Sequence, residues 1–312
     1  MNLTRFQADI ALCIAGLIWG FGFVAQKTAL DHIGPFTFVA ARFLISALFI
    51  LPLVIHEKGF HRLHAAANTK NISRLFILGG AFSLSVLLQQ YGMKVASVTH
   101  TAFLTGLYIV MVPFVGRMFH RQPLLVPTLI ACVLSVFGIW LLSGGQTSDF
   151  AIDFSRGDGM VLLCTFGFAI QVTVMGRLAK RLQLPFTLSF IQCIFVGSIA
   201  LILAIVFEEI NLATLLQAWI PILYAAIASG GIAYTLQAVA QQHTPSADAA
   251  IIMSSEALFG GIGGVWLLHE RLPIQGVFGC CAIMAAIILV ELGPLLTWGR
   301  SLRNKNRAAR KS

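Results

Sequence analysis

Residues 186–207 read FTLSFIQCIFVGSIALILAIVF and contain no charged side chain. An apolar run of roughly 18 or more residues is long enough to cross the hydrocarbon core of a bilayer as a helix. The stretch therefore predicts a transmembrane helix, and similar apolar runs before and after it extend that prediction along the chain.

The composition points to the same class of protein. The 312 residues are 58% hydrophobic and only 11% charged, and the mean hydropathy is +0.86. Because a soluble domain typically carries about 25% charged residues, soluble enzymes, secreted disulfide scaffolds, disordered chains and fibrous proteins are excluded. The six cysteines lie within apolar runs and lack metal-ligand spacing, which predicts packing residues, no metal site and no cofactor.

Ten apolar windows divide the chain. Lipid offers no hydrogen-bond partner to backbone amides, so each window is expected to be helical. We predict an all-α integral membrane protein with ten transmembrane helices. The helices are expected near residues 10–30, 36–55, 74–93, 98–119, 124–142, 159–179, 186–207, 218–240, 246–268 and 274–296.

The two halves of the sequence repeat one another. Pro35-Phe36-Thr37 recurs as Pro185-Phe186-Thr187, and Pro123 recurs as Pro273, at one shared offset. Five helices in each half would give the halves opposite orientations in the membrane. We therefore predict two inverted five-helix repeats, residues 1–145 and 158–296, followed by a basic tail, 297–312. Chance similarity among apolar helices is the alternative.

Lysine and arginine are distributed unequally between the two sides of the predicted bundle. Sixteen lie on the side of the N-terminus and four on the opposite side. Because such residues favour the cytoplasmic side, both termini are expected in the cytoplasm and the protein in the cell inner (plasma) membrane. The net charge of +9 lies mainly in loops and the tail, so we expect anionic lipid, rather than nucleic acid, as the partner of the tail.

Two of the charged residues within the windows, Glu256 and Arg42, are candidates for a function. Glu256, in the ninth, is interpreted as a proton- or substrate-responsive carboxylate, since a charge at that depth costs at least roughly 2.5–3.5 kcal/mol. Alternatively it is a carboxyl hydrogen-bonded between close-packed helices, because Gly260 and Gly264 continue its helix face. Arg42, in the second window, is interpreted first as a structural buried charge or a side chain that snorkels to the interface and fixes the depth of its helix, and alternatively as an anchor for a substrate carboxylate.

Polar residues at helical spacing predict a central cavity. The two clearest faces are Thr101, Thr105 and Tyr108 in the fourth window and Tyr234, Gln237 and Gln241 in the eighth. Ser229-Gly230-Gly231, one turn earlier, predicts a bend. With Glu256 as the only deep acid, the cavity is expected to be lined by Trp19, Gln89, Thr105, Tyr108, Gln171, Tyr234 and Gln237. For Trp19, a place at the membrane interface is the alternative.

Several stretches carry a family resemblance. They are 18–30 (IWGFGFVAQKTAL), 42–45 (RFLI), 102–107 (AFLTGL), 244–250 (TPSADAA), 255–256 (SE) and 269–272 (HERL). Together they resemble EamA-type members of the drug/metabolite transporter superfamily. The resemblance implies ten helices in two inverted repeats, a central cavity and movement of small metabolites, often by export. Many members have proline directly after the glutamate, whereas Ala257 follows it here, so the sequence does not support a bend at that point.

The expected function is therefore secondary transport by alternating access. The substrate is expected to be a small organic metabolite, such as an amino acid or a related amphipathic solute, and the direction export. A membrane-embedded sensor or scaffold that binds a ligand without moving it is the alternative. The sequence carries no Gly-x-Ser-x-Gly nucleophile motif and no phosphate-binding loop, so an enzyme is not expected.

Overall fold

The computed structural model describes residues 3–95, 101, 104–120, 126–142, 156–267 and 274–289, and these residues form helices without any strand. The basic tail 297–312 and the stretch 269–272 lie outside the described residues. The first helices are α1 (Arg5–Leu30), α2 (Pro35–His56), α3 (Gly59–Ala65), α4 (Thr69–Val95), α6 (Tyr108–His120) and α7 (Val126–Leu142). They are followed by α8 (Arg156–Leu182), α9 (Pro185–Phe207), α10 (Leu212–Gln217), α11 (Trp219–Leu223), η1 (Tyr224–Ala233), α12 (Tyr234–Ala240), α13 (Ser246–Met253), α14 (Ser255–Leu267) and the helix Ile274–Leu289.

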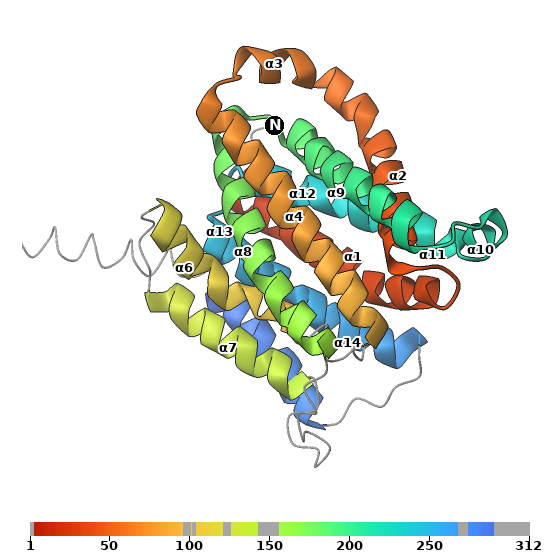
Figure 1. Cartoon of the computed structure of the whole chain (residues 1–312). Coiled ribbons are helices and arrows are strands. Elements are labelled where there is room, and N and C mark those ends of the chain that lie inside the picture. The colour runs from red at the N-terminus through yellow and green to blue at the C-terminus, as the bar shows by residue number, and fades with distance from the viewer. Residues whose placement is uncertain are drawn as a thin grey trace, which may run out of the picture.

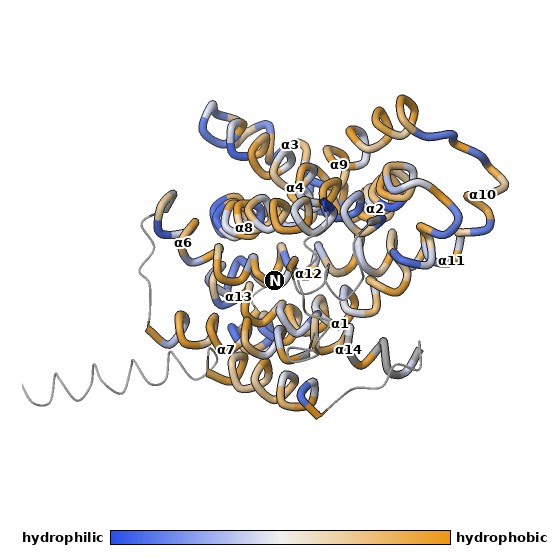
Figure 2. The backbone as a smooth tube through the Cα atoms, turned by 60° about the horizontal axis from the view of Figure 1, so that its bottom comes forward, coloured by the Kyte–Doolittle hydropathy of each residue, from blue (hydrophilic) through white to orange (hydrophobic). Residues whose placement is uncertain are grey.

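Among the described residues, six helices are long and apolar enough to cross a membrane. They are α1, α2, α4, α8, α9 and the continuous run Trp219–Ala240, which joins α11, η1 and α12. Three shorter apolar helices are Leu104–Met118, Val126–Leu141 and Ile274–Leu289. Hydrophobic residues cover most of the helices, whereas polar residues are concentrated at their ends and connections (Figure 2). The predicted all-α membrane protein is confirmed.

The two halves of the chain share one bundle. The most extensive helix contacts join α4 to α8, α2 to α9 and α1 to α14, so each joins residues 1–145 to residues 158–296 (Figure 1). The largest hydrophobic cluster likewise contains Leu12 and Ile109 of the first half and Ile252 of the second. The halves therefore stabilise one another and jointly enclose the centre of the bundle.

Reciprocal carboxylate caps hold α2 and α9 antiparallel. Glu208, at the end of α9, accepts hydrogen bonds from the backbone N–H groups of Phe36 and Thr37, at 2.9 and 2.8 Å. Glu57, directly after α2, accepts one from the backbone N–H of Thr187, at 3.0 Å. The donors belong to the two repeated Pro-Phe-Thr motifs. Because the first N–H groups of a helix lack intrahelical partners, these carboxylates satisfy them and complement the helix dipoles.

Glycines allow α1 and α14 to approach at backbone distance. A Cβ atom at Gly20 would lie 2.7 Å from the backbone oxygen of Glu256 and from the nitrogen of Gly260, and one at Gly16 would lie 2.2 Å from Ser255 Oγ. The sequence predicts that Gly260 contributes to close helix packing, and the structure confirms this prediction. The close contact between α1 and α14 fixes the position of Glu256 relative to α1.

The ninth predicted helix is interrupted. It consists of α13 and α14, which are separated at Ser254. The Ser254 hydroxyl donates to the carbonyl of Ile251 at 2.6 Å, a local bond that competes with the helix. The break thus lies two residues before Glu256 and needs no proline at Ala257.

Candidate substrate cavity

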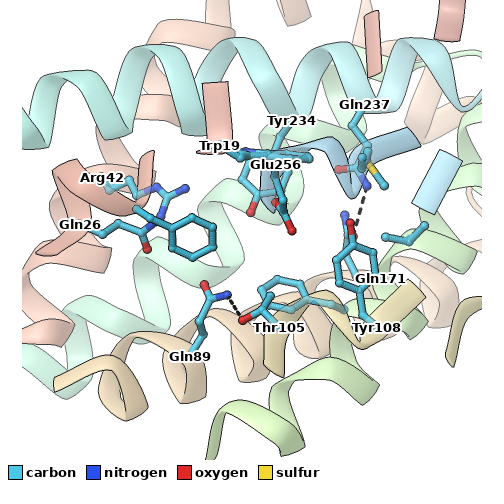
Figure 3. A pocket seen from close by; sticks show the side chains of 14 residues that line it. Trp19, Gln26, Arg42, Gln89, Thr105, Tyr108, Gln171, Tyr234, Gln237 and Glu256 are labelled. Atoms are coloured by element: carbon cyan, nitrogen blue, oxygen red, sulfur yellow. Dashed lines mark hydrogen bonds between the residues drawn. The ribbon is translucent and has the colours of Figure 1, made fainter. Parts of the chain in front are cut away.

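A polar cavity lies between the two halves (Figure 3). The cavity has a volume of about 60 Å³. The lining comes from α1, α2, α4, α6, α8, α12, α13 and α14 and from Thr105, which precedes α6. The described lining residues are Trp19, Phe23, Gln26, Arg42, Gln89, Thr105, Tyr108, Phe168, Gln171, Val172, Tyr234, Gln237, Met253 and Glu256.

The structure brings together every site residue expected from the sequence. The seven proposed lining residues and the two charged residues all border this one cavity. Two members of the polar faces do not: Thr101 is buried elsewhere, and Gln241 donates to the carbonyl of Val172 at 3.0 Å. The apolar members Phe23, Phe168, Val172 and Met253 were missed, because an apolar residue in an apolar helix gives no signal beyond its helical phase.

Side-chain amides connect one side of the cavity. Gln89 Nε2 donates to Thr105 Oγ1 at 2.9 Å, and Gln237 Nε2 donates to Gln171 Oε1 at 3.5 Å (Figure 3). Gln171 Nε2 in turn donates to Gln192 Oε1 at 3.0 Å. The Oε1 atoms of Gln237 and Gln26 are buried and have no hydrogen-bond partner among the described residues. These two oxygens are free to accept hydrogen bonds from a ligand or water.

Arg42 does not snorkel to the interface. Its side chain is buried, borders the cavity and donates from Nη2 to Ser229 Oγ at 2.7 Å. The guanidinium carbon also lies 4.7 Å from the centroid of the Phe43 ring. The Nε atom is buried without a partner among the described residues. Snorkelling is therefore excluded, because the guanidinium lies in the interior of the bundle. The interpretations of Arg42 as a structural buried charge and as an anchor for a substrate carboxylate stay predictions.

Glu256 lies in the first turn of α14, and its carboxyl group points into the cavity (Figure 3). Among the described residues the carboxyl has no hydrogen-bond or ion-pair partner, so the alternative of a carboxyl hydrogen-bonded between helices is not supported. Glu256 and Arg42, an acidic and a basic residue, thus border the same cavity without forming a salt bridge. Unpaired charges away from water are costly, and a ligand of complementary charge would reduce that cost.

Aromatic rings form another wall of the cavity. The Tyr234 ring lies 4.8 Å, between centroids, from both Trp19 and Phe82. Trp19 Nε1 donates to the carbonyl of Ser229 at 3.2 Å, so Trp19 is fixed inside the bundle and is not an interface residue. Ser229 lies in the π-helix η1, which includes the predicted bend and ends next to Tyr234. The irregular helix therefore supplies partners to Trp19 and Arg42.

Glu256 is not the only deep acid. Asp9 and Asp248 are also buried, at one end of α1 and α13. Arg5 Nη2 donates to Asp248 Oδ2 at 2.8 Å, and its Nε lies 3.5 Å from Asp9 Oδ2. Thr244 Oγ1 donates to Asp9 Oδ1 at 2.5 Å. This cluster connects the chain start to the segment between α12 and α13. The sequence gives no clear signal for this cluster, because both acids lie close to the ends of apolar windows.

The fold and cavity define a class of protein: a multi-pass α-helical membrane protein whose halves enclose a polar cavity. The chain belongs to the EamA-like transporter family, which matches residues 6–144 and again residues 155–292. It is 30% identical over 294 residues to a protein of Archaeoglobus fulgidus described as an "Uncharacterized transporter", covering 93% of this chain and 88% of that protein. The chain is therefore a membrane transporter, as the resemblance indicated.

A crystal structure of another protein has the same fold. The match has a TM-score of 0.74 and covers 93% of this chain and 98% of that one. Only 14% of the aligned residues are identical. The fold is thus found in a solved structure whose sequence has diverged widely from this one.

Proposed function

We propose that this protein is a secondary transporter of small zwitterionic metabolites, such as amino acids and related amphipathic solutes, and that it works by alternating access. The observation that carries the proposal is the pair Arg42 and Glu256, a basic and an acidic side chain that border the same cavity without a salt bridge. A zwitterion matches both charges at once, whereas a simple anion or cation leaves one of them uncompensated.

Each wall of the cavity has a role in this proposal. Arg42 receives the carboxylate of the solute, and Glu256 receives its ammonium group. The free Oε1 atoms of Gln26 and Gln237 accept further N–H groups. Trp19 and Tyr234 pack against the apolar part of the solute. With Arg42 as the single basic residue among the described lining residues, the cavity suits a multiply charged nucleotide poorly.

The arrangement of helices supports ten spans in two inverted repeats, residues 1–145 and 158–296. Under that repeat α1 corresponds to α8 and α2 to α9. The repeat likewise relates α4 to η1 and α12, so the contact of α4 with α8 corresponds to the contact of α1 with η1 and α12. It also relates α6 to α14, so the contact of α8 with α6 corresponds to the contact of α1 with α14. The reciprocal caps of Glu57 and Glu208 follow the same relation. We place both termini in the cytoplasm, the protein in the cell inner membrane, and the direction of transport as export.

The function is tested by counterflow in liposomes. Solutes that raise the unfolding temperature of the purified protein identify the ligand, because a ligand that binds only the folded state stabilises it. Liposomes loaded with that unlabelled solute are then expected to accumulate the labelled solute transiently. A ligand that stabilises the protein but gives no counterflow would identify a sensor or scaffold and contradict transport.

The role of Glu256 in coupling has its own test. If Glu256 carries a proton during transport, Glu256→Gln should remove the pH dependence of net transport while expression and exchange remain. If Glu256 only holds the ammonium group, the substitution should weaken exchange itself. A pH profile identical to that of the unsubstituted protein would exclude the coupling role.

A further inference from the structure

A second cavity lies at the surface, between the end of α8 and residues 241–246, which join α12 to α13. This cavity, here called the vestibule, has a volume of about 500 Å³. The described residues that line the vestibule and those that line the central cavity are different. One hydrogen bond joins the two linings: Gln241 Nε2, in the vestibule, donates to the carbonyl of Val172, which borders the central cavity, at 3.0 Å. The walls of the two cavities therefore touch at this point.

A charged cluster holds the segment 244–248 beside the vestibule against the start of α1. Thr244 Oγ1 donates to Asp9 Oδ1 at 2.5 Å, and Arg5 Nη2 donates to Asp248 Oδ2 at 2.8 Å. Arg5 Nε also lies 3.5 Å from Asp9 Oδ2. From α7, Thr128 Oγ1 donates to Asp248 Oδ1 at 3.3 Å. Both ends of the segment are thus tied to α1, and its second end is tied to α7 as well.

The charged cluster lies on helices that line the central cavity further along the chain. On α1, Asp9 lies about 15 Å before Trp19, the first cavity-lining residue of that helix, at 1.5 Å per residue. Leu12 lies between these two residues in the sequence, and Ile252 follows Asp248 on α13. Leu12 and Ile252 are buried in one hydrophobic cluster. Apolar packing therefore separates the charged cluster from the polar cavity.

We infer that residues 241–248 are the gate between the central cavity and the vestibule, and that Arg5, Asp9 and Asp248 latch this gate shut. The structure then shows the gate closed, and its opening joins the two cavities. The side chain of Arg5 is 32% exposed, so water can solvate the latch residues when they separate, which lowers the cost of opening. The inference rests on alternating access in the proposed function and deepens it, because it names the residues that close one side.

The interruption at Ser254 gives the gate a hinge. It separates α13, which carries Asp248, from α14. The close contacts of Gly16 and Gly20 hold α14 against α1. Since hinges are commonly found at the ends of helices, α13 can move away from α1 while α14 stays in place. Glu256 lies in the first turn of α14, so a solute bound at its carboxyl group would lie beside the hinge.

The test measures entry into the central cavity without any solute. In a background whose six native cysteines are replaced, Thr105→Cys supplies a thiol in the cavity. Vesicles of both orientations are exposed to an impermeant maleimide, and the labelling rate is recorded from each side. Asp248→Asn removes the charge that pairs with Arg5. Thr244→Val removes the donor to Asp9 and keeps the shape of the side chain, and it provides a second variant if Asp248→Asn fails to fold.

Each latch variant is expected to label about tenfold faster from the side of the N-terminus and at the same rate from the opposite side. The size of the effect follows from the loss of one hydrogen bond to a charged group, because labelling follows the fraction of protein with an open gate. Asp31→Asn and Thr28→Val, exposed at the other end of α1, are the matched controls and should leave both rates unchanged.

Unchanged rates in both latch variants would overturn the inference. An equal rise from both sides would overturn it too, because it would indicate a general loosening of the bundle. Labelling requires neither solute nor transport, so a failure of counterflow would contradict the proposed function separately from the gate.

Discussion

Individual polar atoms in the central cavity lack hydrogen-bond partners that a bound solute would supply. Gln26 Oε1, Gln237 Oε1 and Arg42 Nε are buried without partners among the described residues. A buried polar group without a hydrogen bond costs about 1–3 kcal/mol of folding free energy. This loss of folding free energy is expected at a binding site, because the same atoms must be free to bind a solute that later leaves. The local arrangement then favours function over stability.

Substitution of the cavity wall should weaken transport without preventing insertion. Tyr108→Ala and Gln237→Ala each remove a side chain that borders the cavity, and each is expected to reduce counterflow about 2- to 10-fold, the worth of one neutral hydrogen bond. Ile202→Ala, on the exposed outer face of α9, is the control and should retain full counterflow. Full activity in the Tyr108/Gln237 double variant would place the substrate elsewhere.

At the scale of single residues, most of the polar part of the cavity could be predicted, although Gln26 was not among the expected lining residues, and the apolar part could not. Gln89, Gln171 and Gln237 stand out because an amide inside an apolar window must face the bundle interior. Phe168 and Met253 do not, since lipid-facing and cavity-facing apolar residues have the same composition. For Arg42 the sequence could not exclude snorkelling, because the depth of the residue along its helix permits snorkelling as well as burial.

Among the helices, the contact of α1 with α14 depends on glycine. Gly20→Ala would place a methyl group 2.7 Å from backbone atoms of α14, so the helices must separate. The expected loss is about 1–3 kcal/mol of unfolding free energy. Gly80→Ala in α4 is the control, because nothing lies within 4 Å of its Cβ position. Alanine there should be neutral or stabilising, by up to about 1 kcal/mol.

Thermal unfolding in detergent measures both glycine variants. Gly20→Ala should unfold at a lower temperature than the unsubstituted protein, and Gly80→Ala at the same or a higher one. Equal midpoints for the two variants would mean that α1 and α14 do not pack at backbone distance.

The carboxylate caps of α2 and α9 give a second prediction for the helices. Glu208→Ala removes the acceptor for Phe36 and Thr37 and should cost about 0.5–2 kcal/mol, as the loss of other helix caps does. Glu209→Ala changes the neighbouring exposed carboxylate and should have little effect. The unfolding midpoints of the two variants test this prediction. A lower midpoint for Glu209→Ala than for Glu208→Ala would contradict the capping role of Glu208.

Helix positions follow from the sequence more reliably than helix interruptions. Long apolar windows identify α2 and α9, because the thickness of the bilayer sets their length. Ser229-Gly230-Gly231 correctly indicated an irregular segment, which the structure shows as the π-helix η1. The break at Ser254 was not expected, since it depends on a side-chain hydrogen bond within an otherwise apolar helix.

For the whole molecule, the inverted relation between the two halves stays a prediction from the internal repeat, and the extensive contacts between the halves were not predicted. The repeated Pro-Phe-Thr motifs marked equivalent helix ends. The pairing of each motif with a carboxylate of the opposite half involves Glu57 and Glu208, which follow their helices and show no pattern of their own. Contacts between distant segments therefore needed the structure.

Membrane orientation is a property of the whole chain and gives the fourth prediction. In the predicted topology, lysine and arginine lie sixteen to four in favour of the side of the N-terminus, and this distribution predicts that the N-terminal side faces the cytoplasm. Ser148→Cys should therefore react with an impermeant maleimide in intact cells, whereas Ser312→Cys should react only after the cells are opened. The reverse labelling pattern would invert the assigned sides.

Access to the cavity from both sides is the most direct test of a transporter built from two halves. The background would have its native cysteines replaced, namely Cys13, Cys132, Cys164, Cys193, Cys280 and Cys281. In that background Thr105→Cys places a thiol in the cavity, and Ser135→Cys, buried in α7 outside it, is the control. Both variants would be exposed to an impermeant maleimide in right-side-out and in inverted vesicles.

The cavity thiol at position 105 is expected to react in both kinds of vesicle and to be protected by the transported solute, while the control thiol at position 135 reacts in neither. Reaction of the cavity thiol from a single side, with and without solute, would contradict alternating access.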